Sequence, residues 1–242
     1  MKPFSRRRLL GAAILGVAGC NSQRTHEGAL GAMERFTDRA QGLLFRKSKL
    51  APEEPESAIT PIKAFPVYHA AEEIPEEPKG WRLQVKGLCA RPLSLSLADL
   101  QRLPRTEMRV RHHCVEGWSA VAAWQGVRMS EVARICGADA RARFVEFRSF
   151  DVAEPDDDAG DDPPPKPYYS SWDRESADHP QTLLAYGMNG ENLAPAHGAP
   201  VRLYSGVKLG YKMVKYLTEI VFQPARGGGT WEDQGYEWFA GV

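Results

Sequence analysis

The strongest constraint on the fold comes from residues 109–124, where a strand-like pattern ends at a single thiol. Because side chains alternate sides along a strand, Met108, Val110 and His112 should share one face. The opposite face then carries basic and imidazole groups: Arg109, Arg111 and His113. Glycine and serine break the alternation soon after Cys114. The sequence therefore predicts a thiol at the end of a half-buried strand, beside cationic and imidazole side chains.

The chemistry expected of Cys114 depends on these neighbours. Positive groups nearby lower the pKa of a thiol and favour the thiolate. A thiolate can act as a nucleophile, a redox sulfur or a soft metal ligand. Free cysteine is also among the most buried residue types and packs as a small hydrophobe. From these residues alone, a functional thiol and a structural one are both open interpretations.

Zinc is a further interpretation, because His112, His113 and Cys114 are all competent ligands. Consecutive strand residues point to opposite faces, so these three side chains cannot easily share one ion. The chain has no Cys-x-x-Cys or His-x-x-x-His pair elsewhere. The pattern therefore disfavours a zinc site.

The N-terminus has the features of an export signal. A twin-arginine pattern, Ser-Arg-Arg-Arg-Leu-Leu, occupies residues 5–10, and an apolar run too short to span a bilayer follows. The run ends in Val-Ala-Gly-Cys, which is typical of a bacterial lipoprotein cleavage site with Cys20 as the lipidated residue. We therefore expect residues 1–19 to be a twin-arginine lipoprotein signal peptide. The mature protein is expected to be periplasmic and anchored to a membrane by lipid.

The rest of the chain divides into a tether and one domain. Residues 20–58 are polar, with a predicted helix from Met33 to Phe45 and an extended connector rich in Pro and Glu. Residues 59–242 carry the strand patterns and are long enough for a sizeable core. Within them, residues 151–167 are dense in Asp and Pro and predict a solvent-exposed loop. Residues 179–185 predict the start of a helical turn.

Local signals predict several other elements. Alternation predicts a half-buried strand over residues 81–87. Ser96 and Asp99 fit a capping box that opens a short helix. A second helix is predicted over residues 130–136 and should end at Gly137.

Three cysteines remain after Cys20, namely Cys89, Cys114 and Cys136. An odd number in an oxidising compartment leaves at least one unpaired within the chain. Cys89 lies in a strand-like run and Cys136 ends a predicted helix, so both are expected in the core. The sequence allows a disulfide bond between Cys89 and Cys136 but does not support it. Cys114 is the better functional candidate.

Residues 113–119, His-Cys-Val-Glu-Gly-Trp-Ser, resemble the cofactor cysteine segment of the sulfite-oxidase-fold molybdopterin oxidoreductases. Further matching segments follow in order: His-Pro-Gln-Thr-Leu-Leu-Ala, His-Gly-Ala-Pro-Val-Arg-Leu, Lys-Leu-Gly-Tyr-Lys and Trp-Glu-Asp-Gln-Gly-Tyr. The resemblance runs from about Ile59 to the C-terminus and is strongest to the bacterial exported branch, which includes the periplasmic methionine sulfoxide reductase catalytic subunit. It implies a strand-rich α+β domain of the sulfite-oxidase type that binds molybdopterin, the molybdenum cofactor.

The resemblance also implies roles for individual residues. Cys114 corresponds to the thiolate that binds molybdenum, and Ser149 to a small polar or thiol residue near the pterin. His197 and Arg202 correspond to the turn and the arginine that hold the pterin and its phosphate. The loop expected to close on the phosphate contains Lys208, Gly210, Tyr211 and Lys212. An arginine fork, lysine charge and open backbone donors suit a phosphate.

Two departures from the family pattern concern the pocket. The family usually has Phe-Pro-Phe-Asn with a tyrosine shortly after, whereas residues 65–71 read Phe-Pro-Val-Tyr-His-Ala-Ala. Tyr68 or His69 therefore stands where the family has a pterin-contacting Asn. The acidic stretch 151–167 is an insertion relative to the family and is interpreted as a solvated loop. A docking patch for a basic redox partner is the alternative interpretation.

The function implied by the resemblance is two-electron oxygen-atom transfer at molybdenum. We expect reduction of an S-oxide or N-oxide, on a small molecule or a protein, with Arg111 and His113 orienting the substrate. A haem protein is the implied electron partner. Sulfite-type oxidation is the alternative within this class of enzyme.

Two alternatives come from other classes of protein. A lipoprotein that keeps the fold as a non-catalytic binding module would carry no metal, and the lost Asn motivates it. A thiol redox protein that uses Cys114 would react as a thiol without metal. A nucleic-acid-binding role is disfavoured, because 31 basic and 31 acidic side chains balance without a basic stripe.

Overall fold

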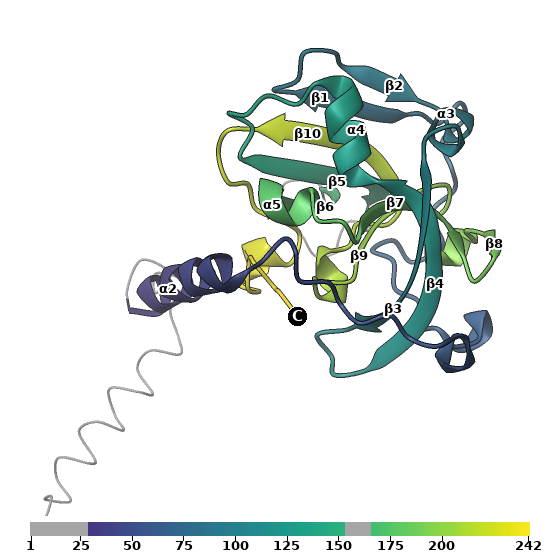
Figure 1. Cartoon of the computed structure of the whole chain (residues 1–242), viewed down its shortest axis with the longest axis horizontal. Coiled ribbons are helices and arrows are strands. Elements are labelled where there is room, and N and C mark those ends of the chain that lie inside the picture. The colour runs from purple at the N-terminus through teal and green to yellow at the C-terminus, as the bar shows by residue number, and fades with distance from the viewer. Residues whose placement is uncertain (1–28, 153–165) are drawn as a thin grey trace, which may run out of the picture. The chain divides into compact units, whose positions relative to one another are not determined.

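The computed structural model describes residues 29–152 and 166–242 (Figure 1). The expected signal peptide 1–19, Cys20 and the middle of the acidic stretch lie outside the described residues. The chain divides into two units, residues 1–44 and 45–242. Helix α2 (Ala29–Leu44) is the described part of the first unit, and it begins before the predicted start at Met33.

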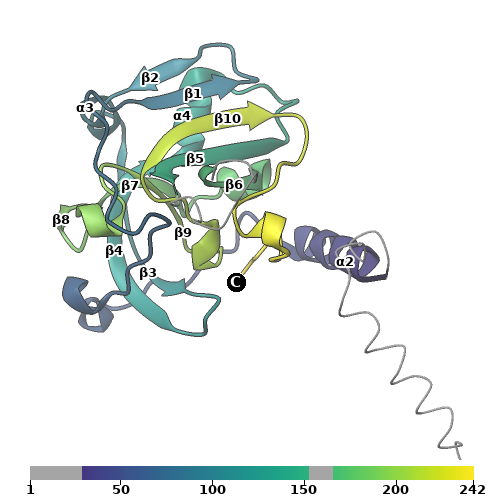
Figure 2. The same ribbon diagram turned by 180° about the vertical axis from the view of Figure 1, so that it is seen from behind.

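The second unit contains two five-stranded sheets. The first sheet has the strand order β2 (Leu93–Leu95), β1 (Leu83–Gly87), β10 (Leu217–Gln223), β5 (Phe144–Val152) and β6 (Pro167–Asp173). Strands β1 and β10 pair in parallel, and the other neighbours are antiparallel. Figure 2 shows β1, β10 and β5 side by side. The β1–β10 pairing joins the start of the domain to its C-terminal part.

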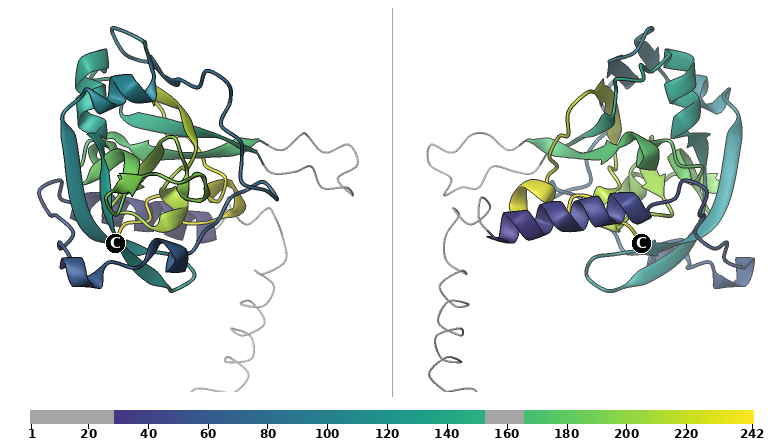
Figure 3. Two further views of the ribbon diagram at one scale, coloured as in Figure 1. Left: turned by 90° about the vertical axis from the view of Figure 1, so that its right-hand side faces the viewer. Right: turned by 60° about the vertical axis from the view of Figure 1, so that its left-hand side comes forward.

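The second sheet follows the order β3 (Arg105–His113), β4 (Ser119–Arg128), β7 (Thr182–Met188) and β8 (Glu191–Asn192), with β9 (Arg202–Ser205) also paired to β7. Strands β3 and β4 form a long hairpin that curves along one side of the domain (Figure 3). At Gly126 of β4, an added Cβ would lie 2.2 Å from the Leu184 carbonyl oxygen, so only glycine permits this approach to β7. The hairpin turn carries Cys114.

Short helices join the strands, and two of their ends match the sequence signals. Ser96 caps α3 (Leu97–Gln101) in a full capping box with Asp99. Helix α4 (Met129–Cys136) ends at Gly137, whose φ of 64° is left-handed. Figure 1 shows α4 lying across the face of the first sheet. A further single-turn helix is α5 (Arg174–Ala177).

Two hydrophobic clusters make the core. The larger one contains residues of both sheets and α4, including Phe147, Trp172 and Val132. The smaller one lies under β3 and includes Val110 and Trp124. The predicted alternation in β3 is confirmed, because Met108, Val110 and His112 are all buried.

The prediction of a helical turn over residues 179–185 is wrong beyond its first residues, because strand β7 begins at Thr182. All seven residues of β7 are buried, and a strand covered on both faces shows no alternation. The loop predicted over residues 151–167 is also shorter than expected. Asp151 is buried at the end of β5, and Pro167 opens β6.

Candidate functional site

A cavity of about 360 Å³ opens beside the turn that follows β3. Its charged and polar lining comes from separate parts of the chain: His112, Cys114, Glu116, Asp151, His197, Arg202 and Lys215. Its aromatic lining is Phe65, Tyr68, Trp118, Tyr168, Tyr211, Trp231 and Tyr236. The cavity therefore combines one thiol, two basic side chains and an aromatic wall.

A tight turn presents Cys114 to the cavity. The Cys114 amide donates to the Trp118 carbonyl at 3.0 Å, and the Gly117 amide donates to the Cys114 carbonyl at 3.1 Å. Gly117 has a φ of 90°, which favours glycine. The turn connects β3 to β4, so the register of that hairpin determines where the thiol lies.

The electrostatic surroundings of Cys114 differ from the sequence expectation. Burial raises the pKa of the thiol, and the Glu116 carboxylate, 3.7 Å from Sγ, raises it further. The expected positive neighbour Arg111 instead forms an ion pair with Glu54 at 2.8 Å. The protein alone thus favours the neutral thiol, and a bound metal ion would supply the positive charge that stabilises a thiolate.

His112, rather than His113, faces the cavity. Burial, the Arg202 charge and the His113 charge lower the pKa of His112 to about 3, so its ring is neutral. The ring stacks with Trp118 at a centroid distance of 5.4 Å. Its Nδ1 has no hydrogen-bond partner in the structure. The alternation of β3 could have indicated this residue, since it placed His112 on the buried face.

Gly210 allows the phosphate-loop residues to approach this histidine. A Cβ at Gly210 would lie 2.7 Å from His112 Nε2, so a side chain there would displace the imidazole. The loop backbone therefore packs closely against the imidazole. Tyr211 also lines the cavity, and its hydroxyl donates to the Glu237 carbonyl at 2.5 Å.

Arg202 is a buried cation that forms no ion pair with the described residues. One guanidinium nitrogen donates to the His197 carbonyl at 3.0 Å, and the Trp124 ring centroid lies 4.9 Å from Cζ. The Arg202 Nε has no hydrogen-bond partner. Burial lowers the pKa of Arg202 to about 10. A buried guanidinium without a carboxylate favours an external anion such as a phosphate.

Lys215 is the second cation of the cavity, and the sequence reasoning missed it. Its Nζ donates to the Ala196 carbonyl at 3.1 Å. Burial, and then the charge of Arg202, lower the pKa of Lys215 to about 7, while Asp151 opposes that shift. The residue follows the glycine-lysine loop by only three positions, and that proximity was the available signal. Arg202 and Lys215 together make the cavity attractive to an anion.

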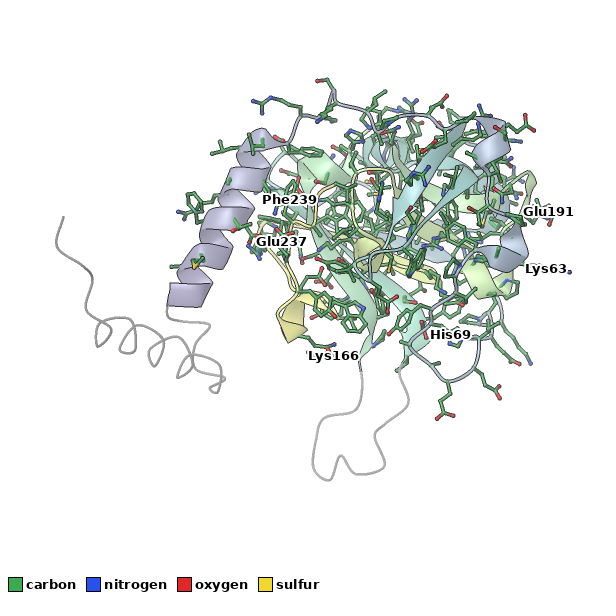
Figure 4. All side chains as sticks on the ribbon, turned by 90° about the horizontal axis from the view of Figure 1, so that it is seen from below. Lys63, His69, Lys166, Glu191, Glu237 and Phe239 are labelled. Carbon is green, nitrogen blue, oxygen red and sulfur yellow. The ribbon has the colours of Figure 1, made fainter. Side chains whose placement is uncertain are left out.

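The structure does not bring Lys208 and Lys212 to the cavity. Lys212 is fully buried, forms an ion pair with Glu232 and donates to the Ser171 carbonyl at 3.1 Å. Lys208 donates to the Phe239 carbonyl at 2.5 Å and lies 3.4 Å from the centroid of its ring. Figure 4 marks Phe239 on the C-terminal segment. Both lysines therefore hold that segment, whose Trp231 lines the cavity.

Of the two residues that replace the family's Asn, only Tyr68 lines the cavity. Its ring centroid lies 6.1 Å from that of Trp231, and the residue is 55% exposed. His69 contacts the Ala71 carbonyl through Nδ1 at 2.6 Å and lies on a surface loop (Figure 4). Tyr68 is therefore a rim residue of the cavity.

Ser149 lies behind the cavity wall. Its hydroxyl accepts a hydrogen bond from the Asp151 amide at 2.8 Å. Asp151 lines the cavity and accepts from the amides of Ala70 at 2.7 Å and Ala71 at 3.0 Å. Ser149 thus helps to hold a carboxylate that organises the loop after Tyr68.

Arg111 and His113 lie on the outer face of β3 and are not lining residues of the cavity. A dedicated all-protein metal site is not found either. Among residues 29–152 and 166–242, no cluster of three or more His, Cys, Asp or Glu side chains could hold a metal ion. A metal that brings its own ligands, as one bound to an organic cofactor does, is compatible with this lining.

The fold and the family match define an oxidoreductase that binds a molybdopterin cofactor. The chain belongs to the oxidoreductase molybdopterin-binding domain family, whose sequence profile matches residues 70–231. The expectations of a molybdopterin cofactor and of a sulfite-oxidase-type fold are confirmed.

Several known proteins are similar to this chain. A protein of Azospira oryzae, named provisionally as protein-methionine-sulfoxide reductase subunit YedZ1, is 37% identical over 99% of this chain and 87% of its own length. The protein-methionine-sulfoxide reductase catalytic subunit MsrP of Campylobacter jejuni is 35% identical, with coverage of 64% and 52%. MsrP of Xanthomonas campestris is 37% identical, with coverage of 63% and 48%. The chain thus spans about half the length of these two MsrP relatives.

Among solved structures, the sulfane dehydrogenase SoxCD of Paracoccus pantotrophus is similar, with a TM-score of 0.57. The identity is 22%, over 71% of this chain and 45% of the SoxCD chain. At this level of identity the similarity concerns the fold.

Proposed function

We propose that this molybdopterin-dependent oxidoreductase reduces S-oxides, with protein-bound methionine sulfoxide as the preferred substrate. The observation that carries the proposal is the meeting of the Cys114 thiol and the unpaired Arg202 guanidinium in one aromatic-lined cavity. The names of the YedZ1 and MsrP relatives support the choice of methionine sulfoxide.

The residues of the cavity fit the cofactor. Cys114 would ligate molybdenum, since a soft thiolate suits a metal that already carries sulfur ligands. Arg202 and Lys215 would bind the phosphate, because both line the cavity and neither forms an ion pair with a carboxylate among the described residues. Glycine at position 210 lets the backbone of the loop pack closely against His112. When bound, the cofactor supplies two-electron oxygen-atom transfer.

The overall reaction consumes two electrons and two protons: the sulfur–oxygen bond of the sulfoxide breaks, and a thioether and water form. The aromatic wall suits a methyl thioether, because sulfur packs favourably against aromatic rings. Trp118 is held in that wall by Glu116, which accepts from its indole nitrogen at 3.0 Å. Neither Arg111 nor His113 reaches the cavity. Residues that line the cavity would therefore orient the substrate in their place.

The cellular setting is also part of the proposal. The twin-arginine pattern and the small-small-Cys motif support export and a lipid anchor at Cys20, on the periplasmic side of a membrane. No helix in the described part of the chain is long and apolar enough to cross a bilayer. A haem protein is the proposed electron donor, on the basis of the family resemblance.

The test is elemental analysis of the wild type and Cys114→Ala, produced with the cofactor pathway intact. Cys89→Ala is the matched control, because Cys89 is a thiol outside the cavity. We expect near-stoichiometric molybdenum in the wild type and the control, and loss of molybdenum or an altered visible spectrum in Cys114→Ala.

Activity is then measured with reduced viologen as the electron donor and an oxidised protein, free methionine sulfoxide or trimethylamine N-oxide as the acceptor. Preferential turnover of the oxidised protein supports the proposal. Turnover of sulfite with an oxidising dye, and of no oxide, would replace it with sulfite-type oxidation. If the wild type folds but contains no molybdenum, the remaining interpretations would be a non-catalytic binding module and a thiol redox protein.

A further inference from the structure

Cys89 and Cys136 are distant in sequence and adjacent in the fold. Cys89 forms an isolated β-bridge with Ala138, just after the C-terminus of α4. The Arg91 amide donates to the Cys136 carbonyl at 2.9 Å, and the Ala90 amide donates to the Gly137 carbonyl at 3.0 Å. These backbone contacts hold the segment after β1 against the end of α4.

These backbone contacts bring Cys89 and Cys136 to neighbouring positions at the C-terminus of α4. Burial, and then the charge of Cys89, raise the pKa of Cys136 to about 11, and the Cys136 thiol donates to the Ala133 carbonyl at 3.3 Å. Cys136 is fully buried, and Cys89 is half-buried. Both are thiols in the structure. One member of the pair is thus reachable from solvent, and the other is its immediate neighbour.

This pair is separate from the cofactor site, because neither cysteine lines the cavity. Cys136 packs in the larger hydrophobic cluster, with Cys89 at its edge. The segment between them contains all of β3 and β4, and therefore the turn that presents Cys114. A bond between the pair would close that segment into a loop.

We propose that Cys89 and Cys136 are an oxidation site at which an intrachain disulfide forms in the folded protein, by exchange with a small disulfide such as oxidised glutathione. The half-buried Cys89 attacks one sulfur of the reagent after losing its proton, forms a mixed disulfide and releases one reagent thiol. Cys136 then attacks the Cys89 sulfur, loses its proton and releases the second reagent thiol. Two protein thiols and one reagent disulfide become one protein disulfide and two reagent thiols.

Disulfide formation at this pair requires no molybdenum. The proposed export would bring the pair into an oxidising compartment. Because the twin-arginine route carries folded proteins, the two thiols must already be adjacent when they arrive, as they are here. The disulfide would reduce the conformational entropy of the unfolded chain. We therefore expect it to raise the melting temperature by about 10 °C.

The experiment uses the folded full-length protein incubated with oxidised glutathione, then denatured and alkylated before and after reduction. Mass spectrometry of peptides reports each cysteine. We expect the Cys89 and Cys136 peptides to be linked to each other before reduction and alkylated only after it, while the Cys114 peptide is alkylated in both samples. Thermal unfolding of the same sample should shift down when reductant is added.

Variants separate the pair from general reactivity. In Cys89→Ala, Cys136 should stay alkylatable and the melting temperature should not respond to reductant. Cys114→Ala is the matched control and should keep the disulfide. The proposal is overturned if Cys89 and Cys136 are both alkylated without reduction in the wild type, or if Cys89 ends only as its glutathione adduct. The wild-type measurement decides the question even if a variant does not fold.

Discussion

Replacing Arg202 by methionine should have opposite effects on stability and on cofactor content. Burial lowers the pKa of Arg202 to about 10. This drop corresponds to roughly 3 kcal/mol of extra cost for keeping the guanidinium charged inside the protein. Methionine carries no charge and matches the aliphatic stem of arginine, so it removes this cost and keeps the packing of that stem.

The substitution Arg202→Met also removes favourable contacts, and their loss reduces the expected gain in stability. The guanidinium lies 4.9 Å from the Trp124 ring centroid and 5.9 Å from that of Tyr204, and such contacts contribute about 1–2 kcal/mol when desolvated. The net expectation for cofactor-free Arg202→Met is a gain of about 1 kcal/mol in the free energy of unfolding. That gain corresponds to a melting temperature about 2–4 °C higher. Molybdenum content of the same variant, produced with cofactor, should fall close to zero.

The assay compares wild type and Arg202→Met, each produced with and without the cofactor pathway. Denaturant unfolding gives the free energies, and elemental analysis gives the metal content. Arg202→Lys is the control, since it keeps the charge without the planar fork and should not stabilise the cofactor-free protein. A cofactor-free Arg202→Met that is less stable than wild type by more than about 2 kcal/mol would refute the reasoning, because it would show that the protein already satisfies the guanidinium.

Three further predictions follow from the buried polar groups and the close approach at Gly210. Because the folded-state pKa of Lys215 is lowered to about 7, the unfolded chain holds this proton at higher pH than the folded chain does. Stability of the cofactor-free protein should therefore rise from about pH 7 towards the ordinary pKa of lysine, and Lys215→Met should flatten that rise in denaturant titrations. Glu232→Gln leaves the Lys212 charge buried without its partner, so thermal unfolding should show a loss of about 3–5 kcal/mol. Gly210→Ala pushes on His112 and should lower stability by about 1–3 kcal/mol, and molybdenum content by elemental analysis with it.

Each of these predictions has a matched control. Lys63→Met changes an exposed lysine and should keep the pH dependence of the wild type. Asp139→Asn breaks a surface ion pair with Arg141 and should cost far less stability than Glu232→Gln. Gly42→Ala meets no atom within 4 Å and should leave metal content unchanged. A control that behaves like its test variant would contradict the corresponding prediction.

Local sequence signals were sufficient where a single element determines the outcome. The capping box at Ser96, the left-handed end of α4 at Gly137 and the alternation of β3 are all read from neighbouring residues, and all three agree with the structure. They failed in β7, where both faces are buried and the apolar run has no period. They also missed β4, whose residues are buried in a nearly continuous run.

The same limit applies to the site. Sequence alone indicated Cys114, and its motif carried the family resemblance, because a thiol at the end of a strand is a local feature. It could not decide whether His112 or His113 lines the cavity, or which of Lys208, Lys212 and Lys215 does. Those choices depend on what packs against each side chain, such as Glu232 against Lys212. Contacts between residues far apart in the chain were likewise needed to bring Cys89 to Cys136.

The amino-acid sequence by itself therefore determined the class of chemistry, through the thiol, the glycine-lysine loop and the ordered family motifs. Only the tertiary structure decided that Arg202 and Lys215 line the cavity, whereas Lys208 and Lys212 bind the C-terminal segment. The physical reason is that a buried charge must find its partner somewhere, and that partner comes from a distant part of the chain. Arg202 has none among the described residues, and that absence is what suits it to an anionic cofactor.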